Sequence, residues 1–206
     1  MIKFIPGFAT TSTIFENQIK ELSVQFPVSN LVSDYLVAWS MGVYDAVRIY
    51  FENKSVIKKM VLVSGTPKFL LDHGYTHGLP DSLFRNLEKK LEADLEGGLE
   101  YFYRLVFNGK THPQIRRLPA IPREKIFADL GRLKNEDIRH LLPQIEIPVL
   151  LIHGSLDQIC LPSASAYMAA LIPNARLEIF EGSAHAPFLD DPKRFNRLVA
   201  GFLKCR

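Results

Sequence analysis

Short, continuous apolar runs alternate with segments of helical periodicity along most of the chain. The apolar runs predict five clear strands, at residues 2–5, 35–38, 58–65, 147–154 and 176–182. Apolar positions at helical spacing predict helices over residues 13–25, 41–52, about 162–172 and about 191–204. Strands that are apolar throughout and that alternate with helices are typical of a parallel sheet covered on both faces. The pattern therefore predicts an α/β fold.

Residues 68–142 follow a different pattern. They are charged and helical in periodicity, contain no convincing strand, and fall between the third and fourth of the clear strands. We therefore predict an α/β core made of residues 1–67 and 143–206, with an inserted helical block at 68–142. The earlier stretch "FPVSNLVSD" (26–34) predicts only a loop or a weak strand.

Composition narrows the class of protein. A chain of 206 residues that is 47% hydrophobic is long enough for one globular domain with a small inserted subdomain. The net charge of +3 is too mild to suggest a nucleic-acid-binding protein. Only two cysteines, Cys160 and Cys205, are present, which suits a reducing compartment. Since no apolar run approaches the roughly 18 residues of a membrane span, we expect a soluble cytoplasmic protein.

A serine lies at the predicted turn between the strand at 35–38 and the helix that follows. The sequence around it, "AWSMG", places Ala38 and Gly42 two residues to either side of Ser40. This pattern on a strand-to-helix turn is typical of a nucleophile elbow, in which a sharp turn exposes the serine at the N-terminus of the helix. A serine before a helix is also a common N-cap. The pentapeptide alone does not separate the two roles.

A nucleophilic serine needs a base, and the base needs an orienting carboxylate. Asp157 follows the strand at 147–154, and His185 follows the strand at 176–182. The carboxyl ends of parallel strands meet at one edge of a sheet. In folds with a nucleophile elbow, the three residues follow in the chain order serine, acid, histidine. The positions therefore predict a triad of Ser40, Asp157 and His185. The alternatives are that Asp157 caps the following helix and that His185 is an ordinary surface residue.

The remaining histidines carry weaker signals. His153 precedes the glycine that ends a predicted strand, so we expect it to be packed and not catalytic. The histidines of the inserted block show no convincing metal-ligand spacing; they are His73, His77, His112 and His140. The sequence therefore predicts no metal site.

Two backbone amides are candidates for an oxyanion hole. Met41 follows the predicted nucleophile directly, so its N–H points toward the site of attack. The early segment "FIPGFATTS" lies at the end of the first strand, and the N–H of Phe8 is its candidate donor. The alternative for Phe8 is a simple turn at Pro6-Gly7.

These motifs resemble those of the α/β-hydrolase superfamily. Within it, the chain is most similar to the esterases that hydrolyse the methyl ester of pimeloyl-acyl-carrier protein in biotin synthesis. The resemblance rests on "AWSMG", "HGSLDQICLP" and, above all, "GSAHAPFLDDP", and it covers about residues 1–10 and 35–206. It implies an α/β-hydrolase fold with an inserted helical lid. Since the strands that come first in the family are absent here, it also implies a reduced, mostly parallel sheet of about six strands.

The resemblance also implies contacts for the substrate. Phe8 and Met41 match positions that touch the substrate, and a lid phenylalanine, assigned to Phe102 in "EYFYRLVFNG", touches it as well. Basic lid residues hold the acidic carrier protein in the family, and Arg116 and Arg117 are our candidates for that role.

The chain departs from the family pattern at two positions near the site. Pro6 replaces the usual histidine before the oxyanion-loop glycine, and Ala38 replaces the first glycine of the elbow. Alanine is small enough for that turn.

The expected activity is ester hydrolysis through an acyl-enzyme, with no metal or organic cofactor. The expected partner is an acyl-carrier protein that bears the substrate; we expect no nucleic acid or membrane partner, and a monomer. One alternative is a generalist carboxylesterase or thioesterase that acts on small acyl esters. Another is a non-catalytic binding protein on a hydrolase scaffold, against which the complete set of serine, acid and histidine argues.

Overall fold

Five parallel strands form one sheet in the computed structural model, which describes residues 1–31, 33–110, 112–115 and 118–205. The strands are β1 (Ile2–Ile5), β2 (Tyr35–Trp39), β3 (Lys59–Val63), β4 (Val149–Gly154) and β5 (Ala175–Phe180). They follow one another across the sheet in chain order, and every neighbouring pair is parallel. The predicted α/β class and the predicted strands are confirmed.

The sheet has five strands and not the expected six or so. Among the described residues of the stretch 26–34, only Val28 pairs with the sheet. It forms a single parallel bridge with Ile2, the first residue of β1. The Ile2 N–H donates to Pro27 O (2.8 Å), and the Ser29 N–H donates to Ile2 O (2.9 Å). Pro27 has no N–H to donate, and the polar residues after Val28 favour turns. The sixth position of the sheet is therefore reduced to a single bridge.

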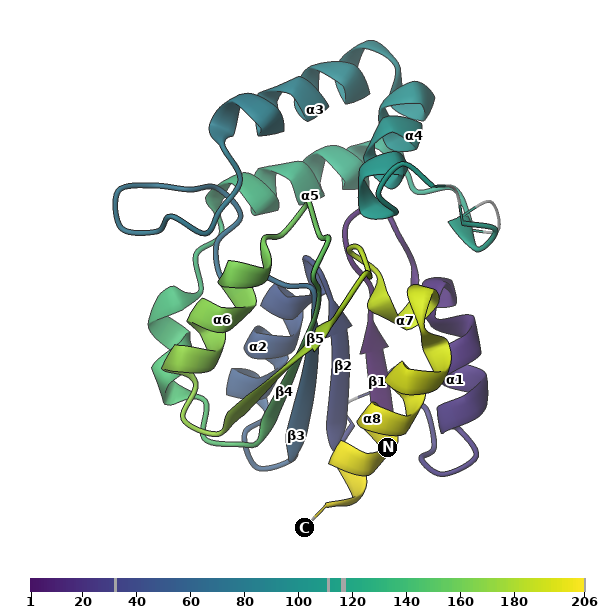
Figure 1. Ribbon diagram of the computed structural model, residues 1–206, viewed down its shortest axis with the longest axis vertical. Helices are drawn as coiled ribbons and strands as arrows, with labels where there is room; N and C mark the ends of the chain where they lie inside the picture. The colour runs from purple at the N-terminus through teal and green to yellow at the C-terminus, as the bar shows by residue number, and fades with distance from the viewer. Residues whose placement is uncertain (32, 111, 116–117, 206) are drawn as a thin grey trace.

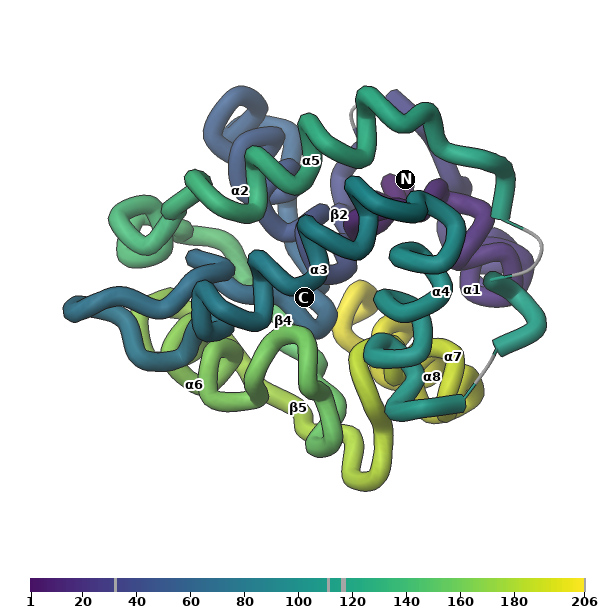
Figure 2. The backbone as a smooth tube through the Cα atoms, turned by 90° about the horizontal axis from the view of Figure 1, so that it is seen from above, coloured from purple at the N-terminus to yellow at the C-terminus, as the bar shows by residue number. Residues whose placement is uncertain are grey.

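Helices cover both faces of the sheet, as the apolar strands require. On one face, α1 (Glu16–Leu22) packs beside α8 (Pro192–Lys204), and on the other lie α2 (Gly42–Glu52) and α6 (Pro162–Leu171) (Figure 2). Short helical turns also lie in the connections, at η1 (Ser12–Phe15), η3 (Arg139–Gln144) and α7 (Pro187–Asp190). The carboxyl ends of the strands remain free of these helices.

The inserted block crosses those carboxyl ends. Its helices are α3 (Asp81–Ala93), α4 (Leu95–Val106) and α5 (Arg123–Asn135), and they lie above the strand arrowheads in Figure 1. The inserted block was expected to be helical, but residues 67–80 form a loop. Prolines stand at both ends of this stretch, and isolated bridges hold it in place. Buried apolar residues of the three helices belong to the same hydrophobic cluster as the strands. The insertion thus packs directly on the rest of the domain.

Candidate active site

A strained turn places Ser40 at the carboxyl end of β2. Its φ angle is +56°, a left-handed conformation that is costly for a residue with a side chain. The Ser40 N–H donates to Val63 O at the end of β3 (2.8 Å), which fixes the turn. A Cβ at Gly42 would lie 2.6 Å from Pro6 O and 2.7 Å from Ile5 O. The small residue two positions after the serine is therefore required because the backbone after β1 passes directly against it.

Ser40, His185 and Asp157 form a continuous chain of hydrogen bonds. The distance from Ser40 Oγ to His185 Nε2 is 2.9 Å, and the distance from His185 Nδ1 to Asp157 Oδ2 is 2.7 Å. A carboxylate only accepts, so Nδ1 carries the proton and Nε2 is free to accept the serine hydroxyl. All three side chains are buried, and the histidine is fully inaccessible. This arrangement can activate the serine oxygen as a nucleophile.

The carboxylate of Asp157 is held by its own loop. Its Oδ1 accepts hydrogen bonds from the backbone N–H groups of Ile159 (2.8 Å) and Cys160 (3.1 Å). The N-cap of α6 is Leu161, so the aspartate does not cap that helix. Burial by itself raises the pKa of Asp157, but His185 and His153 beside it hold that pKa down at about 2. Asp157 is therefore a carboxylate throughout the neutral range.

The depressed pKa of Asp157 predicts a loss of stability in acid. The ordinary aspartate pKa is 3.8 and the folded value is about 2, so the unfolded state binds the proton more readily. The stabilisation, about 2 kcal/mol, is present above pH ~4 and is lost as the pH falls toward ~2. In urea denaturation across this range, the free energy of unfolding should fall more steeply for the wild type than for Asp157→Asn. Parallel curves would contradict this prediction.

Phe8 and Met41 are the two candidates for the oxyanion hole. Met41 follows Ser40 in the chain, and Phe8 follows Gly7, at which a Cβ would lie 2.9 Å from Ser40 Cβ. Both residues are buried, and Met41 continues directly from the elbow into α2. Neither backbone N–H donates a hydrogen bond to another described residue. The residue after Phe8, Ala9, has a φ angle of +52°, so the loop after β1 is also held in an uncommon conformation. Two buried amides of this kind, in the segments next to Ser40, are suited to bind a developing oxyanion.

Helix α4 covers this corner of the site. The ring of Phe102 packs edge-on against Phe8, with 5.1 Å between ring centroids. The Tyr103 hydroxyl donates to Ala9 O (2.5 Å), and Val106 O accepts from the His185 N–H (3.2 Å). The insertion therefore contacts both the candidate oxyanion loop and the histidine loop. The residue expected to touch substrate, Phe102, lies next to a candidate oxyanion residue.

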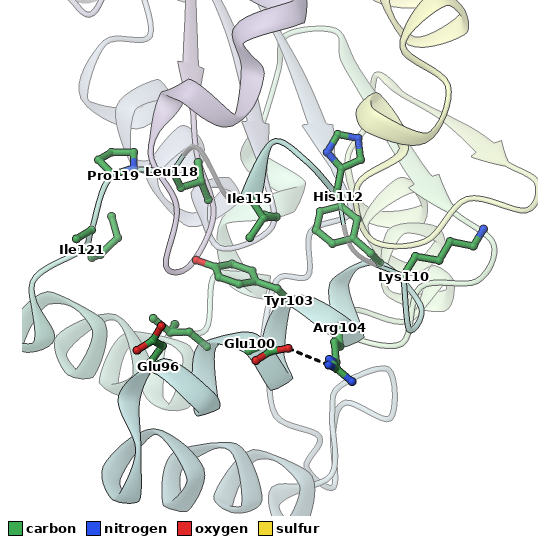
Figure 3. Close-up of a pocket in the computed structure, with 13 residues that line it drawn as sticks. Glu96, Glu100, Tyr103, Arg104, Lys110, His112, Ile115, Leu118, Pro119 and Ile121 are labelled. Atoms are coloured by element: carbon green, nitrogen blue, oxygen red, sulfur yellow. Dashed lines mark hydrogen bonds and ion pairs between the residues drawn. The ribbon is translucent and has the colours of Figure 1, made fainter.

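A groove of about 570 Å³ opens between α4 and a wall formed by His112, Ile115 and residues 118–121 (Figure 3). Its lining is mostly apolar and includes Tyr103 and Phe107, and two other lining residues, Glu100 and Arg104, form an ion pair (2.8 Å). Its size is in the range of small-molecule pockets. None of the three hydrogen-bonded residues Ser40, His185 and Asp157 lines this groove. Because the hydroxyl of Tyr103, which lines the groove, donates to Ala9 O, the groove adjoins the candidate oxyanion loop.

The candidate carrier contacts Arg116 and Arg117 lie outside the described residues. Of the other basic residues of the insertion, Arg132 is already paired, with Asp45 of α2 (2.5 Å) and with Glu136 (2.7 Å). This pairing ties α5 to the helix that follows the serine. Arg132 therefore has a structural partner, which lowers its value as a contact for a carrier protein.

The histidine expected to be packed, His153, is fully buried as expected. However, its Nε2 also lies 3.0 Å from Asp157 Oδ2. An apolar strand pattern predicts burial and does not predict this contact. Within the described ranges, no group of three His, Cys, Asp or Glu side chains is placed to hold a metal ion, and no helix is long and apolar enough to cross a membrane.

Comparison with known proteins defines the class of this fold and site. Residues 33–192 match the family of the alpha/beta hydrolase fold, and the chain belongs to that family. Among curated proteins, it is 32% identical over 167 residues to the pimeloyl-[acyl-carrier protein] methyl ester esterase of Nitrosomonas europaea, a match that covers 76% of this chain and 66% of that protein. It is 29% identical to the esterase of the same name from Legionella pneumophila, over 97% of this chain and 82% of that one.

Solved structures of the same fold include the esterase EaEST from Exiguobacterium antarcticum, with a TM-score of 0.88 at 22% identity over 99% of this chain and 91% of that chain. The enol-lactonase of Burkholderia xenovorans has a TM-score of 0.81 at 15% identity and covers 99% of this chain and 91% of that one. These structures establish the fold. The relatives by sequence support an ester hydrolase.

Proposed function

We propose that the protein is a serine carboxylesterase that hydrolyses the methyl ester of pimeloyl-acyl-carrier protein, releasing methanol in biotin synthesis. The observation that carries the proposal is the unbroken hydrogen-bond chain from Ser40 through His185 to Asp157 on a strained strand-to-helix turn. The names of the relatives support the choice of substrate.

The proposed reaction forms and then hydrolyses an acyl-enzyme. His185 removes the proton from Ser40 Oγ, which attacks the ester carbonyl carbon, and the amides of Phe8 and Met41 hold the oxyanion. The C–O bond to the methoxy group breaks, and His185 gives its proton to the departing methanol. Water, deprotonated by His185, then attacks the acyl-enzyme; the bond to Ser40 Oγ breaks, His185 returns its proton to that oxygen, and pimeloyl-acyl-carrier protein leaves with a free carboxylate. Asp157 fixes the histidine tautomer and stabilises the imidazolium in both halves.

In this proposal the insertion, residues 68–142, serves as a lid. Phe102 touches the acyl chain next to Phe8, since the two rings are in contact at the edge of the site. Arg116 and Arg117 contact the acidic carrier protein. A basic lid that holds the carrier raises the association rate and makes it dependent on salt.

A comparison of two esters tests the choice of substrate. The wild-type protein should hydrolyse the methyl ester of pimeloyl-acyl-carrier protein with a kcat/KM at least roughly tenfold above that for free monomethyl pimelate, and this advantage should shrink as the salt concentration rises. Arg116→Gln with Arg117→Gln should remove much of the advantage and leave hydrolysis of the free ester unchanged. Equal kcat/KM values for both esters at low salt would instead favour a generalist carboxylesterase.

A further inference from the structure

A second imidazole stands against the carboxylate of Asp157. His153, at the end of β4, is fully buried, and its Nε2 bonds to Cys160 O at 2.8 Å and lies 3.0 Å from Asp157 Oδ2. Both of these oxygens only accept, so Nε2 carries a proton. On its other side, Nδ1 lies 2.6 Å from the hydroxyl of Ser165 on α6, which is also fully buried. With the serine donating to Nδ1, every polar atom of the ring has a partner.

The two histidines share one oxygen of the aspartate. Asp157 Oδ2 lies 2.7 Å from His185 Nδ1 and 3.0 Å from His153 Nε2, while Oδ1 is occupied by two backbone amides. His153 thus adds one more side chain to the group formed by Ser40, His185 and Asp157. Ser165 extends the network onto α6, one of the helices that cover the sheet.

We propose that His153 is a positioning residue for ester hydrolysis. It orients the Asp157 carboxylate and partly compensates its negative charge. This compensation weakens the attraction between Asp157 and the protonated form of His185. The proposal rests on the proposed function of Ser40, Asp157 and His185. A donor hydrogen-bonded to a carboxylate stabilises its charge and weakens its pull on a second donor. Without His153, His185 should stay protonated, and therefore inactive as a base, up to a higher pH.

Few other titratable groups compete for this role among the described residues. Burial raises the pKa of the Cys160 thiol, in the aspartate loop, well above its ordinary range, and the nearby Asp157 charge adds to this. Burial likewise raises the pKa of Tyr44 on α2, whose hydroxyl lies near Cys160. Asp190 on α7 accepts from the Ala184 N–H beside His185 (2.9 Å). The thiol and the phenol therefore stay neutral over the assay range.

The first test compares the pH dependence of kcat/KM for hydrolysis of p-nitrophenyl butyrate by the wild type, His153→Leu and His153→Gln. His153→Leu should lower kcat roughly tenfold or more, with KM little changed, and should move the midpoint of the acidic limb upward by about half a pH unit or more. His153→Gln, whose amide N–H can reach the same carboxylate, should keep the limb near the wild-type midpoint. A folded His153→Leu protein with the wild-type kcat and acidic limb would overturn the proposal, as would the same change in both variants.

A second measurement needs no variant at His153, so it stands even if the leucine protein does not fold. In nitrogen-15 histidine NMR spectra of the wild type, the His153 Nε2–H resonance should shift with the same midpoint as the resonances of His185, because both rings lie against Asp157 Oδ2. A His153 resonance that stays fixed while His185 titrates would contradict the proposal. A wild type with no esterase activity at all would count against the proposed function, which the NMR titration does not require.

Discussion

Replacement of Ser40 by alanine is expected to lower kcat/KM for ester hydrolysis by about four orders of magnitude or more, because the remaining hydrogen bonds leave no nucleophile. The fold should survive, since alanine keeps the Cβ that the left-handed turn already tolerates. The rate of p-nitrophenyl butyrate hydrolysis by the purified variant, beside its unfolding curve, measures both effects.

Ser64 offers a matched control for that substitution. It directly follows the neighbouring strand β3, is fully buried, and has a φ angle of +46°. Its Oγ has no hydrogen-bond partner within the described part of the chain. Ser64→Ala should leave kcat/KM within about threefold of the wild type. A Ser40→Ala protein that remains as active as Ser64→Ala would remove the serine from the mechanism.

Gly154→Ala is expected to cost about 3 kcal/mol or more in the free energy of unfolding, or to prevent folding. A Cβ at this position would lie 1.9 Å from Ala184 O and 2.5 Å from Ser183 O. Both atoms are backbone of the loop that carries His185, so relief of the clash would push the histidine away from Asp157. Urea denaturation of the variant, and its esterase activity where it folds, should therefore decline together.

The control for this change is Gly201→Ala in α8, where a Cβ would have nothing within 4 Å among the described atoms. An alanine in the interior of a helix is favoured over glycine, so this variant should gain about 0.5–1 kcal/mol and keep full activity. If Gly154→Ala were as stable as the wild type, the close approach of the β4 end to the histidine loop would be wrong.

The sequence could predict the placement of Ser40, Asp157 and His185 because their positions depend on simple geometry. Each follows a strand of the sheet, the strands are parallel, and so the three side chains meet at one edge of the sheet. That three residues far apart in the chain form one hydrogen-bond chain follows from this topology. Their catalytic roles remain predictions until activity is measured.

Other features depend on packing that no local pattern encodes. The strand pattern predicts that His153 is buried, and it is. Its contact with Asp157 depends instead on the path of the loop after β4, which the pattern does not specify. The weak strand near residue 28 was reduced to one bridge by its proline and polar neighbours. The contact of Phe102 with Phe8 depends on how the insertion docks, which helical periodicity alone does not specify.

The most direct test of the proposed function is growth. A bacterial strain that requires biotin because it lacks its own pimeloyl-carrier methyl esterase should grow without biotin when it carries this gene, and should fail to grow when it carries the Ser40→Ala version at the same protein level. Absence of growth with the wild-type gene, while the purified protein still hydrolyses p-nitrophenyl butyrate through Ser40, would leave the serine hydrolase in place and contradict the role in biotin synthesis. Growth with the Ser40→Ala gene would contradict the mechanism itself.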